Sequence, residues 1–459
     1  MEIVKILATL FLVAILILAM KKKLYIVTSI MGIGVVSLLV ITLITGTSVM
    51  GEKTCGNAIL DVFEFVATSF TSAFANPGLL IVVLVGFSAY MREIKASEVL
   101  VTLACMPLKK IKSPYIICSL AFIIGAIIKL PITSPSGFSA LMMITMFPIL
   151  VSCGVHPITA AATIALSQGC DWGPGDMGSG ICLPITAPDA IVSDYFMDYN
   201  MIAALPMIIV LAIVCPFVYR YFDKKEGLEV VDRSTAEVKE LKDIGVPTFY
   251  AILPLLPIVF VLLFSKFGLK TVVMTTQGAT LLSFFIAVVV EFIRAPKEFP
   301  AVIKRTASYF QSMGNAFTTL VCLVAAANCF AKAISSIGGF TILTDLVANA
   351  GVPAGLILGI IGVLGCLIVV VSSSYNTAAY TFCPSVASIS ASYGLAGTLC
   401  TVPLQLAMGF GRILSPINAS NLLIAGTAGV DIMKTIKRNI IPFICGYLTV
   451  MVVWFLVLA

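Results

Sequence analysis

Long apolar runs recur along the whole chain and are separated by short polar segments. Runs such as residues 202–218 and 251–264 are unbroken, whereas the strands of a transmembrane barrel alternate polar and apolar positions. A run of about 20 apolar residues is long enough to cross a bilayer as a helix. The pattern predicts about ten transmembrane helices, near residues 6–20, 24–44, 61–90, 157–187, 200–219, 247–265, 271–292, 310–337, 396–430 and 439–457.

Two further apolar stretches, residues 114–152 and 353–392, differ from these runs. Each is long enough for two short helices, and each is interrupted at its middle by small polar residues, at positions 134–137 and 374–377. Irregular backbone at membrane depth is tolerated only where it is buried in protein or lines a cavity. Both stretches are therefore predicted to be re-entrant hairpins with their tips near the bilayer midplane.

The interruptions repeat at a constant distance along the chain. A shift of 240 residues places Ser134 on Ser374 and Gly169 on Gly409, and a Gly- or Pro-containing interruption follows each of these glycines. Such paired interruptions are the best sequence pointer to the binding site of a secondary transporter. We therefore expect an all-α polytopic membrane protein of two inverted repeats, each with a re-entrant hairpin and a discontinuous helix.

Positive charges give the orientation of this layout. It places 21 of the 28 Lys and Arg residues on one side, which marks that side as cytoplasmic. Both termini and the second hairpin then face outward, and the first hairpin opens to the cytoplasm. The halves, residues 1–222 and 247–459, are joined by a charged cytoplasmic linker at 223–246. The other seven basic residues are Lys5, Lys53, Lys266 and Lys270 outside, and Lys129, Lys332 and Arg412 within the membrane.

The composition narrows the class of protein. The chain is 60% apolar and 11% charged, against about 45–50% and 25% in soluble domains. This excludes a soluble enzyme, a disordered chain and a nucleic-acid binder. The 13 cysteines include no C-x-x-C pair, and His156 is the single histidine, so neither a disulfide framework nor a zinc site is indicated, and no resident cofactor is expected. His156 precedes Pro157 and is predicted to start a helix.

Arg412 is the most informative charged residue. A guanidinium at mid-membrane costs roughly 2.5–3.5 kcal/mol, so it needs a partner, and its planar fork suits a carboxylate. That carboxylate is either part of a substrate or a side chain from the other half, Asp171 or Asp176. Lys129, just before the first tip, either extends to the membrane surface or helps to hold an anion.

The hairpin tips carry the other candidate groups. Helix N-termini and free backbone N–H groups bind anions. Backbone carbonyls that lack a partner in a broken helix can instead bind the coupling ion, Na⁺ or H⁺. The alternative is that these small residues only permit tight turns and close packing. The candidate substrate-binding residues are Ser134, Ser136, Gly137, Ser374, Asn376, Thr377, Arg412, Ser415 and Asn418, with Asp171, Asp176 and Lys129 as charge partners.

One motif favours another class of protein. Residues 173–176 (GPGD) fit the G-x-G-D pattern of intramembrane aspartyl proteases, which need two carboxylates that share a proton, on facing helices. Asp171 is in the same segment as Asp176, which is the wrong arrangement. The chain also has no phosphate-binding loop of the G-x-x-x-x-G-K-[ST] type, which argues against an ATP-driven pump.

Nearly the whole chain resembles the DcuC group of anaerobic four-carbon dicarboxylate carriers, within the ion-transporter superfamily. The matching segments are residues 86–91 (GFSAYM), 113–115 (SPY), 147–148 (FP), 249–254 (FYAILP) and 411–416 (GRILSP). The resemblance implies two inverted repeats with re-entrant hairpins, and a homodimer. It also implies that Ser374, Asn376 and Thr377 stand for the Ser-Asn-Thr signature of hairpin tips in that superfamily.

The resemblance further implies the activity. The expected function is exchange or cation-coupled carriage of succinate, fumarate or malate across a bacterial inner membrane, by an elevator-type or other alternating-access mechanism. Arg412 would take one carboxylate of the substrate and the hairpin tips the other. A carrier for another small organic anion is the alternative within this class, and neither an enzymatic activity nor a nucleic-acid partner is expected.

Overall fold

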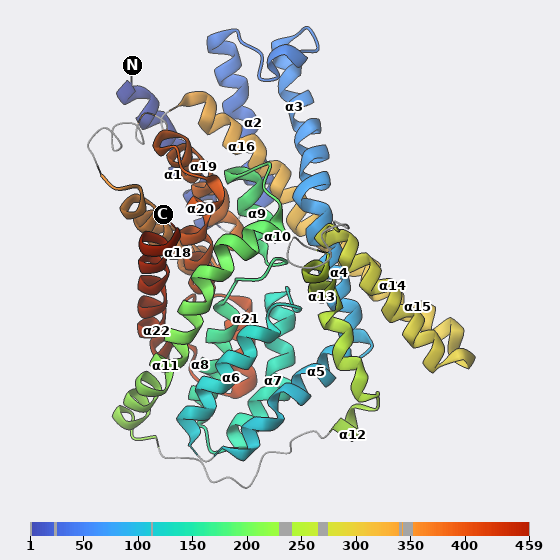
Figure 1. Ribbon diagram of the computed structural model, residues 1–459. Helices are drawn as coiled ribbons and strands as arrows, with labels where there is room; N and C mark the ends of the chain where they lie inside the picture. The colour runs from blue at the N-terminus through green and yellow to red at the C-terminus, as the bar shows by residue number, and fades with distance from the viewer. Residues whose placement is uncertain are drawn as a thin grey trace.

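A computed structural model of the chain describes residues 2–22, 25–111, 113–228, 241–264, 274–338, 342 and 352–458. All regular structure within these ranges is helical (Figure 1). Six of the described helices are long and apolar enough to cross a membrane, and two of the six are the arms α7 and α18 described below. The chain is therefore an all-α protein with the helices of a membrane protein, and the count of ten crossings stays a prediction.

The first half begins its helices where the sequence provides start signals. Pro114, Pro135 and Pro157 each occupy the first position of a helix. At that position the missing N–H of proline costs no hydrogen bond within the helix. The His156 side chain accepts a hydrogen bond from the N–H of Ile158, which confirms its place at a helix start. The elements are α1 (Glu2–Lys21), α2 (Ile26–Thr45), η1 (Gly51–Lys53), α3 (Ala58–Ala73), η2 (Phe74–Gly78), α4 (Leu79–Glu93), α5 (Ala96–Cys105), η3 (Met106–Lys110), α6 (Pro114–Ile128), α7 (Pro135–Ser152), α8 (Pro157–Gly169), α9 (Met177–Thr186), α10 (Val192–Tyr195), η4 (Phe196–Asn200) and α11 (Met201–Lys225).

The second half has the same order of long helices, hairpin and broken helix. Its elements are α12 (Leu241–Ile244), η5 (Thr248–Leu255), α13 (Leu256–Leu263), α14 (Thr276–Arg294), η6 (Pro296–Glu298), α15 (Phe299–Ala316), η7 (Phe317–Val321), α16 (Cys322–Ile337), α18 (Ala354–Ser372), α19 (Tyr375–Tyr393), α20 (Gly397–Ile413), α21 (Ala419–Ala428), α22 (Ile432–Val453) and η8 (Trp454–Leu458).

Both predicted hairpins are present as helix pairs, α6–α7 and α18–α19. Both predicted broken helices are present as well, with α8 and α9 separated by residues 170–176, and α20 and α21 by residues 414–418. The starts of α18, α19 and α20 each follow the starts of α6, α7 and α8 by 240 residues. In Figure 1, α6 and α7 lie in the lower part of the view and α19 in the upper part.

Each broken helix packs into the opposite half. Phe410 of α20 belongs to the core built from α6, α7, α8 and α11, whereas Cys182 of α9 belongs to the core around α18, α19 and α20. Helices α8 and α20 cross where their glycines meet, since a Cβ built on Gly409 would lie 2.5 Å from the carbonyl oxygen of Gly169. This crossing brings the two interruptions together.

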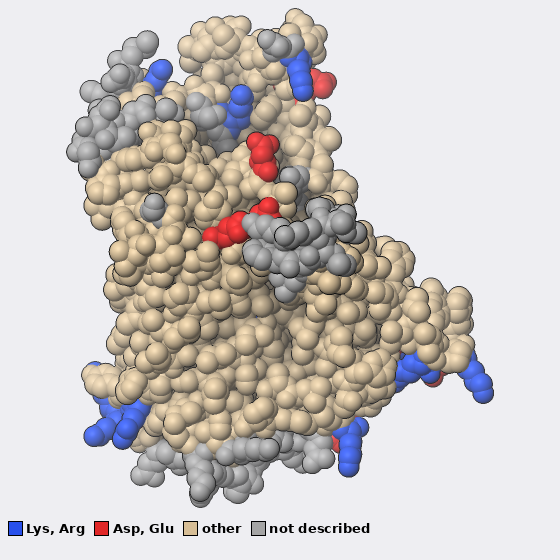
Figure 2. Space-filling view, viewed as in Figure 1, with Lys and Arg blue, Asp and Glu red and all other residues tan. Residues whose placement is uncertain are grey.

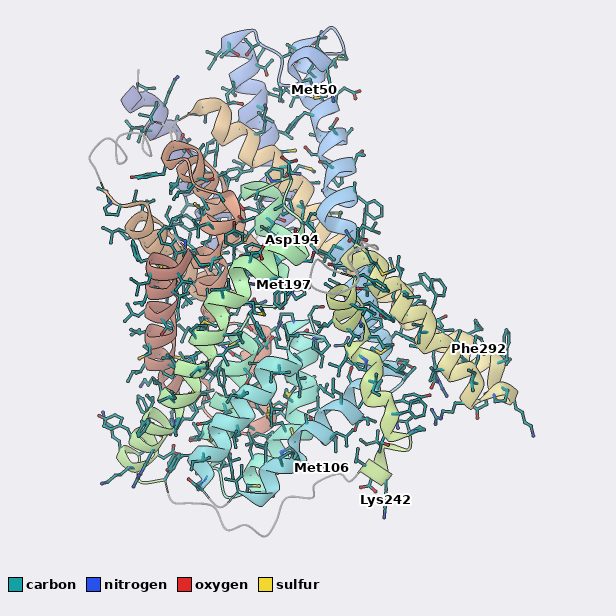
Figure 3. All side chains as sticks on the ribbon, viewed as in Figure 1. Met50, Met106, Asp194, Met197, Lys242 and Phe292 are labelled. Atoms are coloured by element: carbon teal, nitrogen blue, oxygen red, sulfur yellow. The ribbon has the colours of Figure 1, made fainter. Side chains whose placement is uncertain are left out.

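Basic side chains lie toward two opposite ends of the molecule. On the described residues of the face in Figure 2, Lys and Arg lie near the upper and lower ends, and none lies across the broad zone between them. Figure 3 places Met106 and Lys242 at one end of the molecule and Met50 at the other. Tandem helices that end in polar loops at two opposite ends are typical of a bilayer-spanning bundle.

The expected linker begins later than the sequence indicated. Helix α11 continues to Lys225, and Asp223, which was assigned to the linker, is only 3% exposed. Its carboxylate lies 2.9 Å from the guanidinium of Arg438 on α22 and accepts a hydrogen bond from Thr159 of α8. Packing of α22 against α11 therefore orders residues that look like a solvated loop in the sequence. Positions 229–240 of the linker lie outside the described residues.

Candidate functional site

Four charged side chains meet at the interruption of the first half. Lys129, at the end of α6, lies 2.6 Å from Asp176 and 3.2 Å from Asp171, and Asp171 also forms an ion pair with Arg412 of α20. None of the four is more than 4% exposed. We call these residues, Lys129, Asp171, Asp176 and Arg412, the charged quartet.

The quartet is electrically balanced, with two cations and two carboxylates. A buried charge is tolerated when it is paired and hydrogen-bonded, and each member has an opposite charge beside it. The structure thus places Arg412 in an ion pair with Asp171, one of the two alternatives that its sequence left open. Lys129 is fully buried, so its predicted extension to the membrane surface is wrong. The quartet leaves no net positive charge for an anionic substrate.

Hydrogen bonds fix the quartet in place. The second oxygen of Asp176 accepts the N–H of Gly173 at 2.6 Å. Gln405 of α20 donates to the carbonyl of Asp171 at 3.2 Å and accepts from the hydroxyl of Tyr195 at 2.8 Å. Gln405 was not singled out from the sequence, although a glutamine in the middle of an apolar helix is the kind of signal that finds such a residue.

These contacts also bear on the protease alternative. An aspartyl protease dyad needs two carboxylates that share one proton. Here Lys129 lies between Asp171 and Asp176 within ion-pair distance of both. The cation holds the carboxylates as a structural pair, and the G-x-G-D motif forms the turn between α8 and α9.

The first hairpin tip opens on a cavity. Ser134 precedes α7, and its Oγ accepts the N–H of Gly137 at 3.3 Å. The cavity has a volume of about 430 Å³, within the range of small-molecule sites. Its walls come from α4, the first tip, the interruption after α8, and α15. They consist of Ile81, Val85, Thr133, Ser134, Pro135, Ser136, Gly175, Ser312, Asn315 and Ala316.

One wall of the cavity carries a polar atom without a partner. Thr133 is 6% exposed, and its Oγ1 has no hydrogen-bond partner in the described part of the chain. A buried hydroxyl without a partner costs free energy that a ligand or water can recover. Thr133 was not among the residues expected from the sequence. Ser136 was expected from the sequence, and it is exposed in the cavity wall.

At the second tip, an aromatic side chain lies beside Arg412. Ser374 caps α19 as Ser134 caps α7, and accepts the N–H of Thr377 at 3.3 Å. The next residue, Tyr375, is buried, and its ring centre lies 5.2 Å from the guanidinium carbon of Arg412. No residue from this tip is among those that line the described cavity.

The remaining candidates belong to the second tip and to the interruption after α20. Asn418, in the interruption after α20, donates to the Oγ of Ser373 at 3.1 Å. Asn376 and Ser415 are buried, and one side-chain oxygen of each has no partner among the described residues. The candidates of the first half therefore lie at the first tip, and those of the second half lie at or next to the second tip. The charged quartet lies between the tips: Lys129 is beside the first, and Arg412 contacts Tyr375 of the second.

A search of known families gives the decisive match. The family model of the C4-dicarboxylate anaerobic carrier DcuC matches residues 3–459. The chain belongs to the DcuC family. This membership confirms the resemblance drawn from residues 86–91, 249–254 and 411–416.

Individual relatives agree with the family. The chain is 30% identical over 431 residues to the anaerobic C4-dicarboxylate transporter DcuC of Escherichia coli K12, covering 93% of this chain and 91% of the relative. It is 29% identical to a probable transporter of the same name from Vibrio cholerae, covering 90% of each. This DcuC-family chain is thus related over nearly its full length to membrane transporters, which are not enzymes.

Two solved structures share the fold. MtrF of Neisseria gonorrhoeae, described as one of a class of antimetabolite efflux pumps, superposes with a TM-score of 0.60 at 15% identity, over 93% of this chain and 94% of its own. The YdaH transporter of Alcanivorax borkumensis, described as having an unusual topology, gives 0.59 at 14% identity, over 93% and 97%. The DcuC-family chain has a transporter fold.

Proposed function

We propose that this protein carries four-carbon dicarboxylates such as succinate, fumarate and malate across the bacterial inner membrane. The observation that carries the proposal is the cavity of about 430 Å³ at the first hairpin tip, lined by hydroxyl groups beside the N-terminus of α7. The positive end of a helix and free hydroxyls suit a carboxylate. The names of the relatives supply the four-carbon class.

We propose two inverted repeats as the framework of transport. The 240-residue spacing of three pairs of helix starts and the contact of Gly169 with Gly409 support this arrangement. The cavity lies between the first hairpin with its interruption on one side and α4 with α15 on the other. Movement of the hairpin side against α4 and α15 would expose the cavity alternately to the two sides of the membrane, in an elevator-type or related alternating-access cycle.

Coupling and assembly are part of the same proposal. Exchange against a second dicarboxylate, or coupling to Na⁺ or H⁺, would drive uptake or efflux. The buried oxygens of Asn376 and Ser415 that have no partner in the described residues are candidate ligands for a cation. We expect a homodimer with both termini on the outer face, which crosslinking and accessibility labelling of the full chain in vesicles would test.

The test is uptake of radiolabelled succinate into proteoliposomes that contain the purified full-length protein. The vesicles are preloaded with fumarate, with citrate or with buffer, and each set is run with and without Na⁺ and with and without a pH gradient. Protein-free vesicles are the control. Stimulation by internal fumarate supports exchange, and stimulation by a cation gradient supports coupling. Uptake no faster than in protein-free vesicles under all conditions contradicts the proposal.

A carrier for another small organic anion is the alternative. The same vesicles decide it through competition by unlabelled mono-, di- and tricarboxylates. Competition by four-carbon dicarboxylates alone supports the proposed substrate class. Stronger competition by another anion would identify that anion as the substrate and would leave the assignment as a transporter unchanged.

A further inference from the structure

Arg92 lies against the first hairpin tip. It lies in the last turn of α4 and is one of the 21 basic residues that the predicted layout places on the cytoplasmic side. A Cβ built on Gly137 would lie 1.7 Å from Nη1 of Arg92 and 3.2 Å from Oγ of Ser134. The guanidinium therefore touches the first turn of α7, and a side chain at position 137 would require it to move.

This guanidinium has no carboxylate beside it in the described part of the chain. Other buried or half-buried arginines do have one: Arg412 pairs with Asp171, Arg438 with Asp223, and Arg305 with Glu291. Arg92 is half-buried and forms none of the ion pairs found among the described residues. Partial burial of a guanidinium without a counter-ion costs desolvation free energy, and a bound anion would offset that cost.

The group beside Arg92 is also positive. The N-terminus of the 18-residue helix α7 carries partial positive charge on its free N–H groups. A guanidinium and a helix N-terminus in contact repel each other unless an anion lies between or beside them. Ser134 borders both the guanidinium and the cavity, and the buried Oγ1 of Thr133 in the same wall lacks a partner.

We propose that Arg92 binds one carboxylate of the transported anion at the first turn of α7, next to Ser134, which lines the cavity. This assignment rests on the proposed dicarboxylate function and identifies its cationic binding residue. Charge balance supports Arg92 over Arg412, because Asp171 already neutralises Arg412 within a quartet of zero net charge. The planar fork of arginine suits a carboxylate, and its charge offsets one of the two charges of the substrate.

The experiment compares Arg92→Gln and Arg92→Lys with the wild type, as purified full-length proteins. Succinate affinity is measured as ligand-induced thermal stabilisation and as KM in proteoliposomes. We expect an affinity loss of about ten- to hundredfold in Arg92→Gln. Arg92→Lys should retain only part of the affinity, because the planar fork is lost. Without ligand, both variants should melt close to the wild type, because no ion pair is broken.

A matched control removes a neighbouring charge. Lys95 lies three residues beyond Arg92, and its ammonium donates to the carbonyl of Ile244, away from the tip. Lys95→Gln should keep the wild-type affinity for succinate. Succinamate, in which one carboxylate of succinate is an amide, is the second probe. Loss of Arg92 should reduce the preference for succinate over succinamate, whereas a purely structural role would leave that ratio unchanged.

Gly137→Ala provides an independent variant that keeps the arginine. The added methyl would collide with Nη1 and displace the guanidinium, so succinate affinity should fall by about tenfold even though no charge is removed.

The outcomes separate the two proposals. If the wild type binds and carries succinate, and Arg92→Gln and Gly137→Ala retain its affinity and substrate preference, the assignment of Arg92 is overturned and the dicarboxylate function stands. If the wild type neither binds nor carries succinate, the proposed function fails and this assignment fails with it. If Lys95→Gln matches Arg92→Gln, the effect is one of general surface charge, and the assignment is also overturned.

Discussion

The two hairpin tips have the same local structure and different surroundings. At each tip a serine caps the second helix of the pair and accepts the N–H of the residue three positions later, at 3.3 Å in both cases. The first tip borders an open cavity and the guanidinium of Arg92. At the second tip, Tyr375 is buried, and its ring centre lies 5.2 Å from the guanidinium carbon of Arg412.

The difference shows that a capping motif does not by itself define a binding site. A serine cap satisfies one backbone N–H group of the helix wherever it occurs. Whether the other N–H groups meet a ligand depends on the helices that surround the tip. Here α4 and α15 leave space beside Ser134, whereas α9 and α20 close around Tyr375.

The largest expected effect concerns the quartet between the tips. Asp171→Asn or Arg412→Gln alone leaves a buried charge without its partner and should destabilise the protein by about 3–5 kcal/mol. The double variant should recover most of that loss, because both charges are removed. Thermal unfolding of the purified single and double variants measures the coupling. Additive losses would show that the two residues do not depend on each other.

The second tip is tested by Asn376→Ala and Thr377→Ala. If this tip contributes a ligand to substrate or cation, succinate uptake should fall by about fivefold to tenfold, the size of one lost hydrogen bond, with little change in melting temperature. Ser390→Ala, further along the same helix, is the control, because the Ser390 hydroxyl already donates to the carbonyl of Leu395. Normal uptake in both variants would mean that the second tip serves packing alone and that only the first tip binds a ligand.

The caps themselves should differ only in function. Ser134→Ala and Ser374→Ala each remove a helix cap, so each should cost about 1 kcal/mol of stability. Only Ser134→Ala should also raise the KM for succinate, because only Ser134 lines the cavity. Melting temperatures and uptake kinetics are measured on the same preparations. Equal rises in KM would mean that the tips act alike.

Arg412→Lys should have the smallest effect. Lysine keeps the charge that neutralises Asp171, so succinate affinity should stay within about threefold of the wild type, a difference below 1 kcal/mol. Arg92→Lys, measured in parallel, should lose more. A large loss of affinity in Arg412→Lys, with normal stability, would restore Arg412 as a carboxylate clamp and reverse the contrast between the two arginines.

Several elements were predictable because their signals are local. Proline at the first helical position and serine at the cap lie within a few residues of the boundaries that they determine. The hairpin arms α6 and α7 therefore span the predicted residues 114–152, and the break before Met177 falls inside the predicted interruption. Residue type was enough to single out Arg412 and Lys129 as buried charges, since such groups are costly in apolar runs.

The partners of these residues were not predictable in the same way. The predicted layout of crossings places Arg92 among the cytoplasmic charges. No local sequence feature near Arg92 indicates a contact with Gly137. Asp223 resembled the start of a solvated linker until α22 brought Arg438 against it. In both cases the contact joins helices that are far apart along the chain.

The sequence by itself determined the class of protein, the places where helices start and break, and the identity of the buried charges, because apolar length, proline and glycine act over short distances. Only the tertiary structure decided which charge meets which. The crossing of α8 and α20 sets Asp171 beside Arg412, and the end of α4 sets Arg92 beside Gly137. Coulomb energy depends on distance in space and on burial, and packing between separate helices fixes both.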